Sequence, residues 1–456
     1  MKFTMNAAAI ANLLQGRLHG EAIEVSGQLS TDSRSVSAGD IFIALVGERF
    51  DGHAYVSQVA QCGAALAIVS TLQEQVAIPQ VVVADTLRAY GQLAGYLRDQ
   101  FKGAVFGITG SSGKTSCKEM LVAILSEAGR VHATAANFNN EVGVPLTLSQ
   151  IEQAHDFAVI EMGAGKPDDI SYLVDFAKPN IALVTNVGEA HLELFGSVEN
   201  IGATKKQIYN ATEQLQAAVV HGDDVLTGGW LAELSARGLA VLSFGLEAHN
   251  DVCPQDLKVN IEGSCFTLQT PKGEVSVVLA VPGYHMVKNA CAAAAMALHA
   301  GVSLDAIAQG LANYHSVKGR LASRRLGDIS LIDDTYNANP RSMRAAIDTL
   351  ALAQGRRVLV AGDMAELGPD AEQLHRAIGE YAHGKVDAWF SAGPLMANAA
   401  QGYGEGAVHC GDVEKLNSLL PAHIKTGDTV LVKGSRSSRM ERVIAALEEY
   451  FKEGAA

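Results

Sequence analysis

The sequence lacks long uninterrupted apolar runs, closely paired cysteines and an excess of basic residues. No apolar run approaches the length of a membrane-spanning helix, so we expect no membrane span. The 6 cysteines are scattered without CxxC spacing, which is typical of reduced thiols in a cytoplasmic protein and argues against disulfides or a zinc site. The formal net charge of −14 argues against a general nucleic-acid or anionic-membrane surface. Any anionic ligand must therefore be bound by local donors, such as backbone amides or a few basic side chains.

Composition and length indicate a globular protein of several domains. Hydrophobic residues make up 48% of the 456 residues and charged residues 18%, which is typical of a folded chain. The chain is too long for one ordinary hydrophobic core. It contains no long low-complexity linker and no fixed-period repeat, and no segment of the sequence indicates an obligate protein partner.

The order of strand-like and helix-like segments predicts three α/β domains. Residues 1–84 contain short apolar runs that we interpret as buried strands. Residues 85–314 alternate apolar strands with helical periodicity, which predicts a mostly parallel sheet covered on both faces, followed by antiparallel hairpins. Residues 315–456 begin a third α/β alternation and end in an amphipathic helix.

The strongest motif is TGSSGKTS, at residues 109–116, between an apolar strand and a helical segment. Glycines in such a loop let backbone N–H groups approach phosphate oxygens, and the helix N-terminus adds partial positive charge. Lys114 would reach the β- and γ-phosphates, and the Thr115 hydroxyl would coordinate Mg²⁺. The alternative is a Gly/Ser turn with an incidental lysine. The motif departs from a strict phosphate loop, because Ile108 stands where that loop has glycine. The chain also lacks the Asn-Lys-x-Asp motif that reads guanine, which argues against a GTPase.

Acidic and imidazole side chains follow two other strands of the central segment. Glu161 ends the strand FAVIE, and His191 follows the strand NIALV. Strand ends of an open parallel sheet face the ligand crevice, where a carboxylate oxygen suits Mg²⁺. Histidine is a softer ligand, so His191 taken alone is more typical of a surface residue or of a donor that supports a ligand.

The segment DDTYNANP, at residues 333–340, crowds polar side chains at the end of another strand. Its proline is placed for the first turn of a helix, so an ordinary capped turn is one interpretation. The density of Asp, Asn and Tyr in this short segment favours a functional site.

The motifs together resemble the Mur ligase superfamily across almost the whole chain. They occur in order as TGSSGKT, NFNNEVGVPLT, EMGA, NVGEAHLELFGS, GYHMVKNACAA, GRL, DDTYNANPRSM, GDMAELG and VKGSR. TGxxGKT alone marks only the superfamily. The combination of NFNNEVGVP, DDTYNANP and GDMAELG is most similar to the branch that uses UDP-N-acetylmuramoyl-tripeptide and D-alanyl-D-alanine.

This resemblance implies an ATP-dependent carboxylate–amine ligase of cytoplasmic peptidoglycan precursor synthesis, acting through an acyl phosphate. It implies a UDP-substrate-binding N-terminal domain, a central P-loop-type ATPase domain and a C-terminal Rossmann-like domain. It also implies two Mg²⁺ ions, held by Thr115, Glu161, His191 and Lys205. Lys205 matches a position that the family carbamoylates, although Gln207 replaces an acidic residue and Lys206 leaves the register open.

The remaining implied site residues fall into three groups. Those implied in catalysis are Lys114, His191, Lys205 and Arg320. Those implied in ATP binding are Gly110, Ser111, Ser112, Gly113, Lys114, Thr115, Ser116, Asn289, Arg320 and Asp334. Those implied in substrate binding are Ser33, Arg34, Asn137, Asn140, Asn337 and Asn339. Arg341 stands where the family more usually has Asp, so that edge of the site is expected to differ.

The sequence leaves rival functions open. Another ligase of the superfamily, such as a folylpolyglutamate synthase or a different Mur ligase, would share most of the motifs. A small-molecule kinase would share the phosphate loop but release a phosphorylated product, and a nucleotide switch would not need the metal ligands. Because the motifs divide between the central and C-terminal segments, we expect the nucleotide to lie between these two domains.

Overall fold

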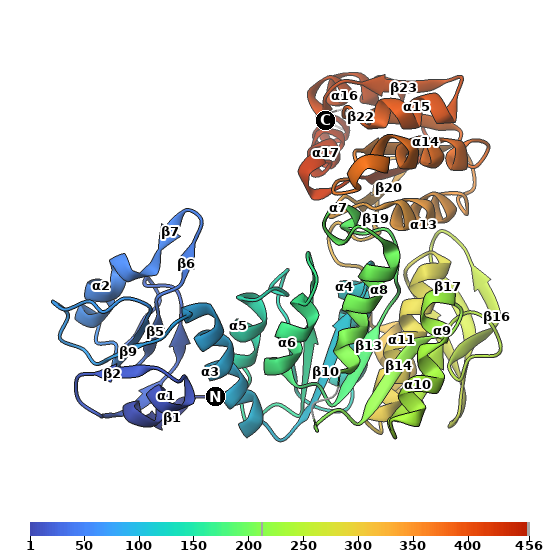
Figure 1. The fold of residues 1–456 in the computed structure, drawn as a ribbon. Coiled ribbons are helices and arrows are strands. Elements are labelled where there is room, and N and C mark those ends of the chain that lie inside the picture. The colour runs from blue at the N-terminus through green and yellow to red at the C-terminus, as the bar shows by residue number, and fades with distance from the viewer. Residues whose placement is uncertain (211–212, 454–456) are drawn as a thin grey trace.

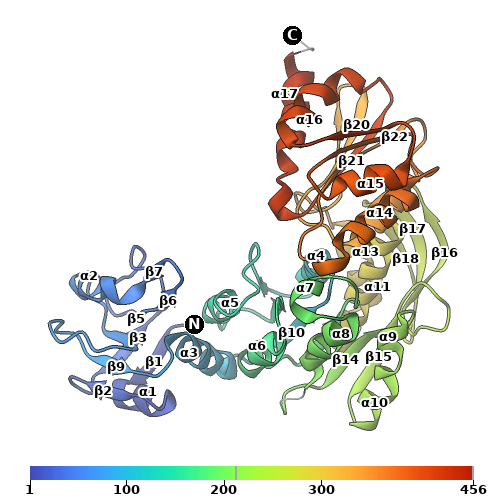
Figure 2. The ribbon, with the colours of Figure 1, turned by 45° about the horizontal axis from the view of Figure 1, so that its top comes forward.

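The computed structural model describes residues 1–210 and 213–453 and has an α/β fold with three successive domains, as predicted. The N-terminal domain lies to one side of the central domain, and the C-terminal domain stands over the opposite part of the central domain (Figure 1). A second view shows the same separation between the N-terminal and C-terminal domains (Figure 2).

The N-terminal domain is built on a five-stranded sheet of order β2-β9-β8-β5-β4, in which only β2 is antiparallel to its neighbour. Its core contains apolar side chains from the strands, from α1 and from the following helix α3. The elements are β1 (Phe3–Asn6), α1 (Ala7–Leu13), β2 (Arg17–His19), β3 (Glu24–Gly27), β4 (Leu29–Ser30), β5 (Ile41–Ile43), β6 (Val46–Gly47), β7 (Phe50–Asp51), η1 (Gly52–Tyr55), α2 (Val56–Gln61), β8 (Leu66–Val69) and β9 (Gln80–Val82).

Helix α3 (Thr86–Gln100) joins the N-terminal and central domains. Asp85 caps its N-terminus, since the carboxylate accepts hydrogen bonds from the backbone N–H groups of Leu87 and Arg88. One part of the helix buries Leu93 in the N-terminal core, and Ala94 packs into the core of the central domain. This shared helix fixes the chain where it passes from one sheet to the next.

The central domain contains a six-stranded parallel sheet of order β11-β12-β10-β13-β14-β15. Successive side chains of β10 point to opposite faces, so that Phe106 and Ile108 pack against α4 and α11, whereas Val105 packs against α5 and α6. Both faces are therefore buried, as the apolar strands predicted. The elements are β10 (Ala104–Thr109), α4 (Lys114–Ser126), β11 (Val131–Ala133), α5 (Gly143–Ser149), β12 (Phe157–Glu161), α6 (Asp169–Ala177), β13 (Ile181–Val184), α7 (Leu192–Phe195), α8 (Val198–Lys206), η2 (Gln207–Tyr209), β14 (Ala217–His221), α9 (Val225–Gly228), α10 (Trp230–Ala236) and β15 (Ala240–Phe244).

The predicted hairpins form a separate three-stranded antiparallel sheet of order β16-β17-β18. Its inward side chains, including Phe266 and Leu268, join the core around the small-residue helix α11. The elements are β16 (Cys253–Val259), β17 (Ser264–Thr270), β18 (Gly273–Leu279), α11 (Tyr284–His299) and α12 (Leu304–Ala312).

The C-terminal domain has a six-stranded sheet of order β19-β20-β24-β21-β22-β23, in which only β19 is antiparallel. Alternate residues of β21 face opposite layers, with Val358 and Val360 toward α16 and α17 and Leu359 toward α13 and α14. The elements are β19 (Ala322–Leu326), β20 (Ile329–Asp334), α13 (Pro340–Leu350), β21 (Arg357–Gly362), η3 (Gly368–Asp370), α14 (Ala371–Ala382), β22 (Ala388–Ala392), α15 (Met396–Tyr403), β23 (Ala407–Cys410), α16 (Val413–Leu419), η4 (Leu420–His423), β24 (Thr429–Lys433), η5 (Arg436–Ser438) and α17 (Glu441–Glu453).

The sheets of the three domains occupy residues 3–82, 104–279 and 322–433. The domain limits 1–84, 85–314 and 315–456 remain a prediction, and their junctions fall between these sheets. Among the helices of residues 1–210 and 213–453, none combines the length and apolar character needed to cross a membrane.

Candidate active site

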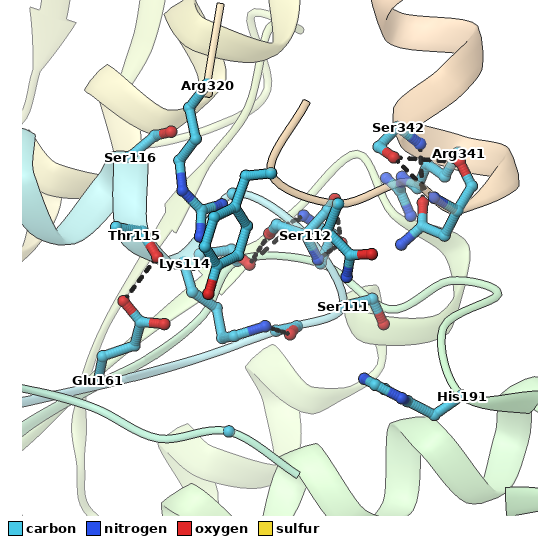
Figure 3. A pocket seen from close by; sticks show the side chains of 18 of the residues that line it. Ser111, Ser112, Lys114, Thr115, Ser116, Glu161, His191, Arg320, Arg341 and Ser342 are labelled. Carbon is cyan, nitrogen blue, oxygen red and sulfur yellow. Dashed lines mark hydrogen bonds between the residues drawn. The ribbon is translucent and has the colours of Figure 1, made fainter. Parts of the chain in front are cut away.

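A cavity of about 930 Å³ lies where the central and C-terminal domains meet. The central domain contributes the loop after β10 and the ends of β12 and β13, and the C-terminal domain contributes the segment after β20 and the start of α13. Figure 3 shows Lys114, Thr115 and Glu161 near Arg320, with Arg341 farther along the same cavity. The two groups of motifs that are far apart in the sequence therefore line one space.

Two glycines shape the loop between β10 and α4. Gly110 has φ 152° and Gly113 has φ 77°, both in the region that favours glycine. A Cβ at Gly110 would lie 1.8 Å from Thr185 Oγ1, and one at Gly113 would lie 2.8 Å from Asn289 Oδ1. Without side chains at these two positions, the loop can lie close to Thr185 and Asn289. Helix α4 begins at Lys114, with its N-terminus at the cavity. This geometry is that of a phosphate-binding loop.

The segment that follows β13 braces this loop through a dense set of hydrogen bonds. Ser111 Oγ and the backbone of Gly188 exchange hydrogen bonds of 3.0 Å, with Ser111 donating to the carbonyl and accepting from the N–H. The side chain of Asn186 accepts from Ser112 N at 3.1 Å and donates to Ser112 O at 2.9 Å. Thr185 Oγ1 also donates to Ser112 O at 2.7 Å. The loop is therefore held in position by side chains that the sequence motif does not contain.

Two side chains that could offer oxygen ligands to a metal ion, Thr115 and Glu161, meet at the start of α4. Thr115 Oγ1 donates to Glu161 Oε2 at 2.8 Å, and Asn139 Nδ2 donates to Glu161 Oε1 at 2.8 Å (Figure 3 draws the first of these). A hydroxyl and a carboxylate beside a phosphate loop suit Mg²⁺, which prefers oxygen ligands and keeps several waters. The chemistry of these donors thus fits the predicted ion, although residues 1–210 and 213–453 contain no cluster of three or more His, Cys, Asp or Glu arranged for a metal.

Lys114 folds back over its own loop, where Nζ donates to Gly110 O at 2.8 Å. Burial lowers the pKa of Lys114, the negative charge of Glu161 opposes this shift, and the positive charge of Arg320 adds to it. A bound polyphosphate would supply negative charge to both cations.

Lys205 is 2% exposed and lines the same cavity from the last turn of α8. Burial and the positive charge of Lys114 lower the pKa of Lys205 to about 7, against the opposing charge of Asp169. A buried ammonium beside another cation is unfavourable, whereas a carbamate would be an anionic oxygen ligand, so this environment fits the predicted modification.

His191 lies at the cavity but is turned toward the C-terminal domain. Its backbone is left-handed, with φ 57°, and its Nδ1 pairs with Glu366 of that domain. Burial lowers the pKa of His191, and the charge of Glu366 opposes the shift. Figure 3 shows the ring set apart from Thr115 and Glu161. The role of His191 as a ligand of a second metal remains a prediction.

The C-terminal domain presents its own charged groups. The guanidinium of Arg320 lies over the ring of Tyr336, 4.0 Å from the centroid. Lys433 Nζ donates to Asp334 Oδ2 at 2.6 Å and to Asn337 O at 2.9 Å, which ties the end of β24 to the DDTYNANP segment. Arg320 and Asp334 both line the cavity, as does Asn289 of α11.

The residues predicted to bind substrate are spread over three places. Asn140 lines the cavity, and Asn137 is exposed outside it. Asn337 and Asn339 line the cavity, and Asn339 also caps α13 by accepting from Ser342 N at 2.8 Å. Ser33 and Arg34 form a turn of the N-terminal domain, where Arg34 pairs with Asp32 at 2.7 Å. Their roles remain predictions.

Several cavity residues were not singled out from the sequence. Asn139 and Asn186 lie within or beside quoted motifs, but nothing in the pattern distinguished them from neighbouring asparagines. Lys433 ends a predicted strand in VKGSR, which is a signal that could have identified it. The contact of Arg341 with Asp224 joins residues far apart in the chain and had no signal in the sequence.

Three domain families match successive parts of the chain. They are the Mur ligase family, catalytic domain, at residues 27–95; the Mur ligase middle domain, at residues 108–297; and the Mur ligase, glutamate ligase domain, at residues 319–436. A curated relative from Escherichia coli K12, UDP-N-acetylmuramoyl-tripeptide–D-alanyl-D-alanine ligase, is 41% identical over 98% of this chain and 99% of its own. The chain therefore belongs to the Mur ligase family.

Solved structures of enzymes called MurF are similar to this chain over almost its full length. MurF from Acinetobacter baumannii has a TM-score of 0.89 and 37% identity, covering 98% of this chain and 99% of its own. MurF from Thermotoga maritima, solved in complex with ADP, has a TM-score of 0.85 and 30% identity, covering 93% and 98%. The relative with the same enzyme name in Bacillus subtilis is 34% identical over 96% of this chain and 97% of its own. The similarity thus extends over all three domains.

Proposed function

We propose that this chain is an ATP-dependent ligase that joins UDP-N-acetylmuramoyl-tripeptide to D-alanyl-D-alanine through an acyl phosphate. The reaction belongs to peptidoglycan precursor synthesis and so serves cell-wall formation, cell shape and division. We place the reaction in the cytoplasm, in keeping with the scattered cysteines.

The observation that carries this proposal is the cavity itself. A phosphate loop with Lys114 and the Thr115–Glu161 pair faces Arg320 and Asp334 of another domain across one space. A nucleotide triphosphate in that cavity would have its phosphates at the loop and its γ-phosphoryl group among cations from both domains. This is the arrangement that transfer of a phosphoryl group requires, since positioning and charge neutralisation supply most of the catalysis.

The chemistry explains why ATP is needed. A carboxylate does not react with an amine near neutral pH, because its leaving group is an oxide. Attack of the carboxylate oxygen on the γ-phosphorus breaks the bond to ADP and gives an acyl phosphate. The neutral amine then attacks the acyl carbon, phosphate leaves, and the amine gives up a proton to a base. Lys114 and Arg320 stabilise the negative charge of the phosphoryl group in the first step.

Mg²⁺ supplies charge neutralisation at the phosphates when it is bound. We assign Thr115 and Glu161 to one ion, and we assign His191 and a carbamoylated Lys205 to a second. The hydroxyl and carboxylate oxygens of Thr115 and Glu161 support the first assignment, and the burial of the Lys205 amine near Lys114 supports the second.

We infer the two substrates from the names of the similar enzymes and not from the shape of the cavity. Full-length similarity to enzymes named for UDP-N-acetylmuramoyl-tripeptide and D-alanyl-D-alanine supports both. We assign the UDP portion to the N-terminal domain, with Ser33 and Arg34 as contacts. Asn137 and Asn140 of the central domain and Asn337 and Asn339 of the C-terminal domain complete the proposed substrate contacts.

Release of ADP tests the proposed reaction. We expect the purified protein with ATP and Mg²⁺ to release ADP and phosphate at a high rate only when UDP-N-acetylmuramoyl-tripeptide and D-alanyl-D-alanine are both present. Equal release of ADP with the tripeptide nucleotide alone, without release of phosphate and with a stable phosphorylated product, would identify a kinase. Release that requires a folate and glutamate instead would identify the folylpolyglutamate branch.

A further inference from the structure

Arg341 is a cavity residue that the proposed mechanism does not use. It lies in the first turn of α13, whose start is fixed by reciprocal hydrogen bonds between Asn339 and Ser342. The backbone that carries Arg341 is therefore well anchored in the C-terminal domain. Its side chain nevertheless reaches into the central domain, where it makes its polar contacts.

The guanidinium makes two contacts across the domain boundary. Arg341 Nη1 donates to Val187 O at 2.5 Å and to Asp224 Oδ2 at 3.0 Å. The Asp224 side chain is 8% exposed and that of Arg341 is 33% exposed, so the carboxylate of this pair is shielded from solvent and the arginine is only partly buried. Burial alone would raise the pKa of Asp224, but the nearby His221, 3.7 Å from the carboxylate, and the hydrogen bond and positive charge of Arg341 outweigh it and hold that pKa below its usual range. The guanidinium therefore binds a carboxylate and a carbonyl of the central domain, and its charge is balanced by Asp224 without a bound phosphate.

The contact with Val187 leads directly to the phosphate loop. The next residue, Gly188, exchanges two hydrogen bonds of 3.0 Å with Ser111. The arginine stem also lies against this residue, because a Cβ at Gly188 would come within 3.0 Å of Arg341 Cδ. A continuous path of contacts thus runs from α13 through Arg341 and Gly188 to Ser111.

We propose that Arg341 is a positioning residue that holds the phosphate loop in its phosphate-binding shape through Val187, Gly188 and Ser111. Asp224 holds the guanidinium in place for this purpose. The inference rests on the proposed ATP-dependent reaction, and it gives the C-terminal domain a direct influence on the geometry of a loop in the central domain. The expected consequence is selective, because only ligands that use the loop should be affected.

Nucleotide binding by the Arg341→Ala variant tests this role. We expect the dissociation constant for ATP, measured by calorimetry, to rise about tenfold, the size expected for loss of a charge-assisted hydrogen bond. The affinity for AMP, which has no β- or γ-phosphate, should be unchanged. The conservative Arg341→Lys variant should lose less, because its ammonium can still pair with Asp224. The matched control is Arg357→Ala, which removes an Arg–Asp pair of 2.7 Å elsewhere in the C-terminal domain and should leave both affinities unchanged.

A double-mutant cycle distinguishes positioning from a general structural role. If Arg341 acts through Ser111, the effects of Arg341→Ala and Ser111→Ala on ATP affinity should be clearly less than additive. Unchanged ATP affinity in Arg341→Ala, equal losses for ATP and AMP, or additive effects would each overturn the proposal. If the wild-type chain failed to ligate while Arg341→Ala still lost ATP affinity selectively, the proposed reaction would be wrong and the positioning role would stand.

Discussion

Replacing Lys114 with alanine should lower turnover by about a thousandfold or more at saturating ATP. The side chain brings a full positive charge to the loop that receives the phosphates, and its value is greatest when charge shifts onto the transferred phosphoryl group. Fold stability should change little, because Nζ donates only to Gly110 O in the described structure and its burial as an ammonium is itself unfavourable. ADP release and thermal unfolding, measured together, check both parts.

The control for this variant is Lys178→Ala. Lys178 belongs to the same domain and forms an ion pair of 2.5 Å with Asp99 at a partly exposed site outside the cavity. Its removal should leave turnover unchanged, since exposed ion pairs contribute little. If Lys114→Ala kept wild-type turnover with a normal unfolding curve, the loop would not be the site of phosphoryl transfer.

Replacing Lys205 with alanine should reduce activity about a hundredfold, and a small carboxylate such as formate or acetate should restore part of it. The amine of Lys205 is buried near the positive charge of Lys114, and without the carbamate this side chain offers the site no anionic oxygen. A carboxylate that enters the space left by the lysine would replace the oxygen of the proposed carbamate. Activity measured against formate and acetate concentration checks the effect.

The neighbouring Lys206 provides a matched control and settles the register. Lys206 is more exposed, pairs with Glu233 and lies 5.8 Å from the centroid of the Trp230 ring. Lys206→Ala should leave activity near that of the wild type. If Lys206→Ala lost activity and Lys205→Ala did not, or if carboxylates failed to rescue Lys205→Ala, the assignment of Lys205 would be wrong.

Local sequence was sufficient to predict the parts of the site that form within one turn of chain. The loop of residues 109–116 carries its own glycines and lies directly between a strand and a helix, so its presence was predictable from neighbouring residues, although Thr185 and Asn186 help to hold its shape. The helix start after Asn339 was predictable for the same reason, because Pro340 is favoured in a first helical turn. The antiparallel hairpins were also predicted, since their turn residues are local.

Contacts between distant segments could not be predicted in this way. The bond between Thr115 and Glu161 depends on β10 and β12 being neighbours in the sheet, which strand patterns alone do not determine. The Arg341–Asp224 pair depends further on how two domains pack. His191 shows the same limit, because its pairing with Glu366 of the C-terminal domain has no counterpart in the local motif. Resemblance to a family supplied expectations for such residues, and geometry then showed which of them line one cavity.

The central claim is that the carboxylate of the tripeptide is activated as an acyl phosphate in the cavity between the two domains. The most direct measurement uses tripeptide nucleotide labelled with oxygen-18 in its terminal carboxylate, followed by mass analysis of the phosphate released during ligation. In the proposed reaction the carboxylate oxygen that attacked the γ-phosphorus stays bonded to phosphorus, because attack of the amine on the acyl carbon breaks the carbon–oxygen bond. Each released phosphate should therefore carry one oxygen from the labelled carboxylate. Productive ligation that releases unlabelled phosphate would contradict the account.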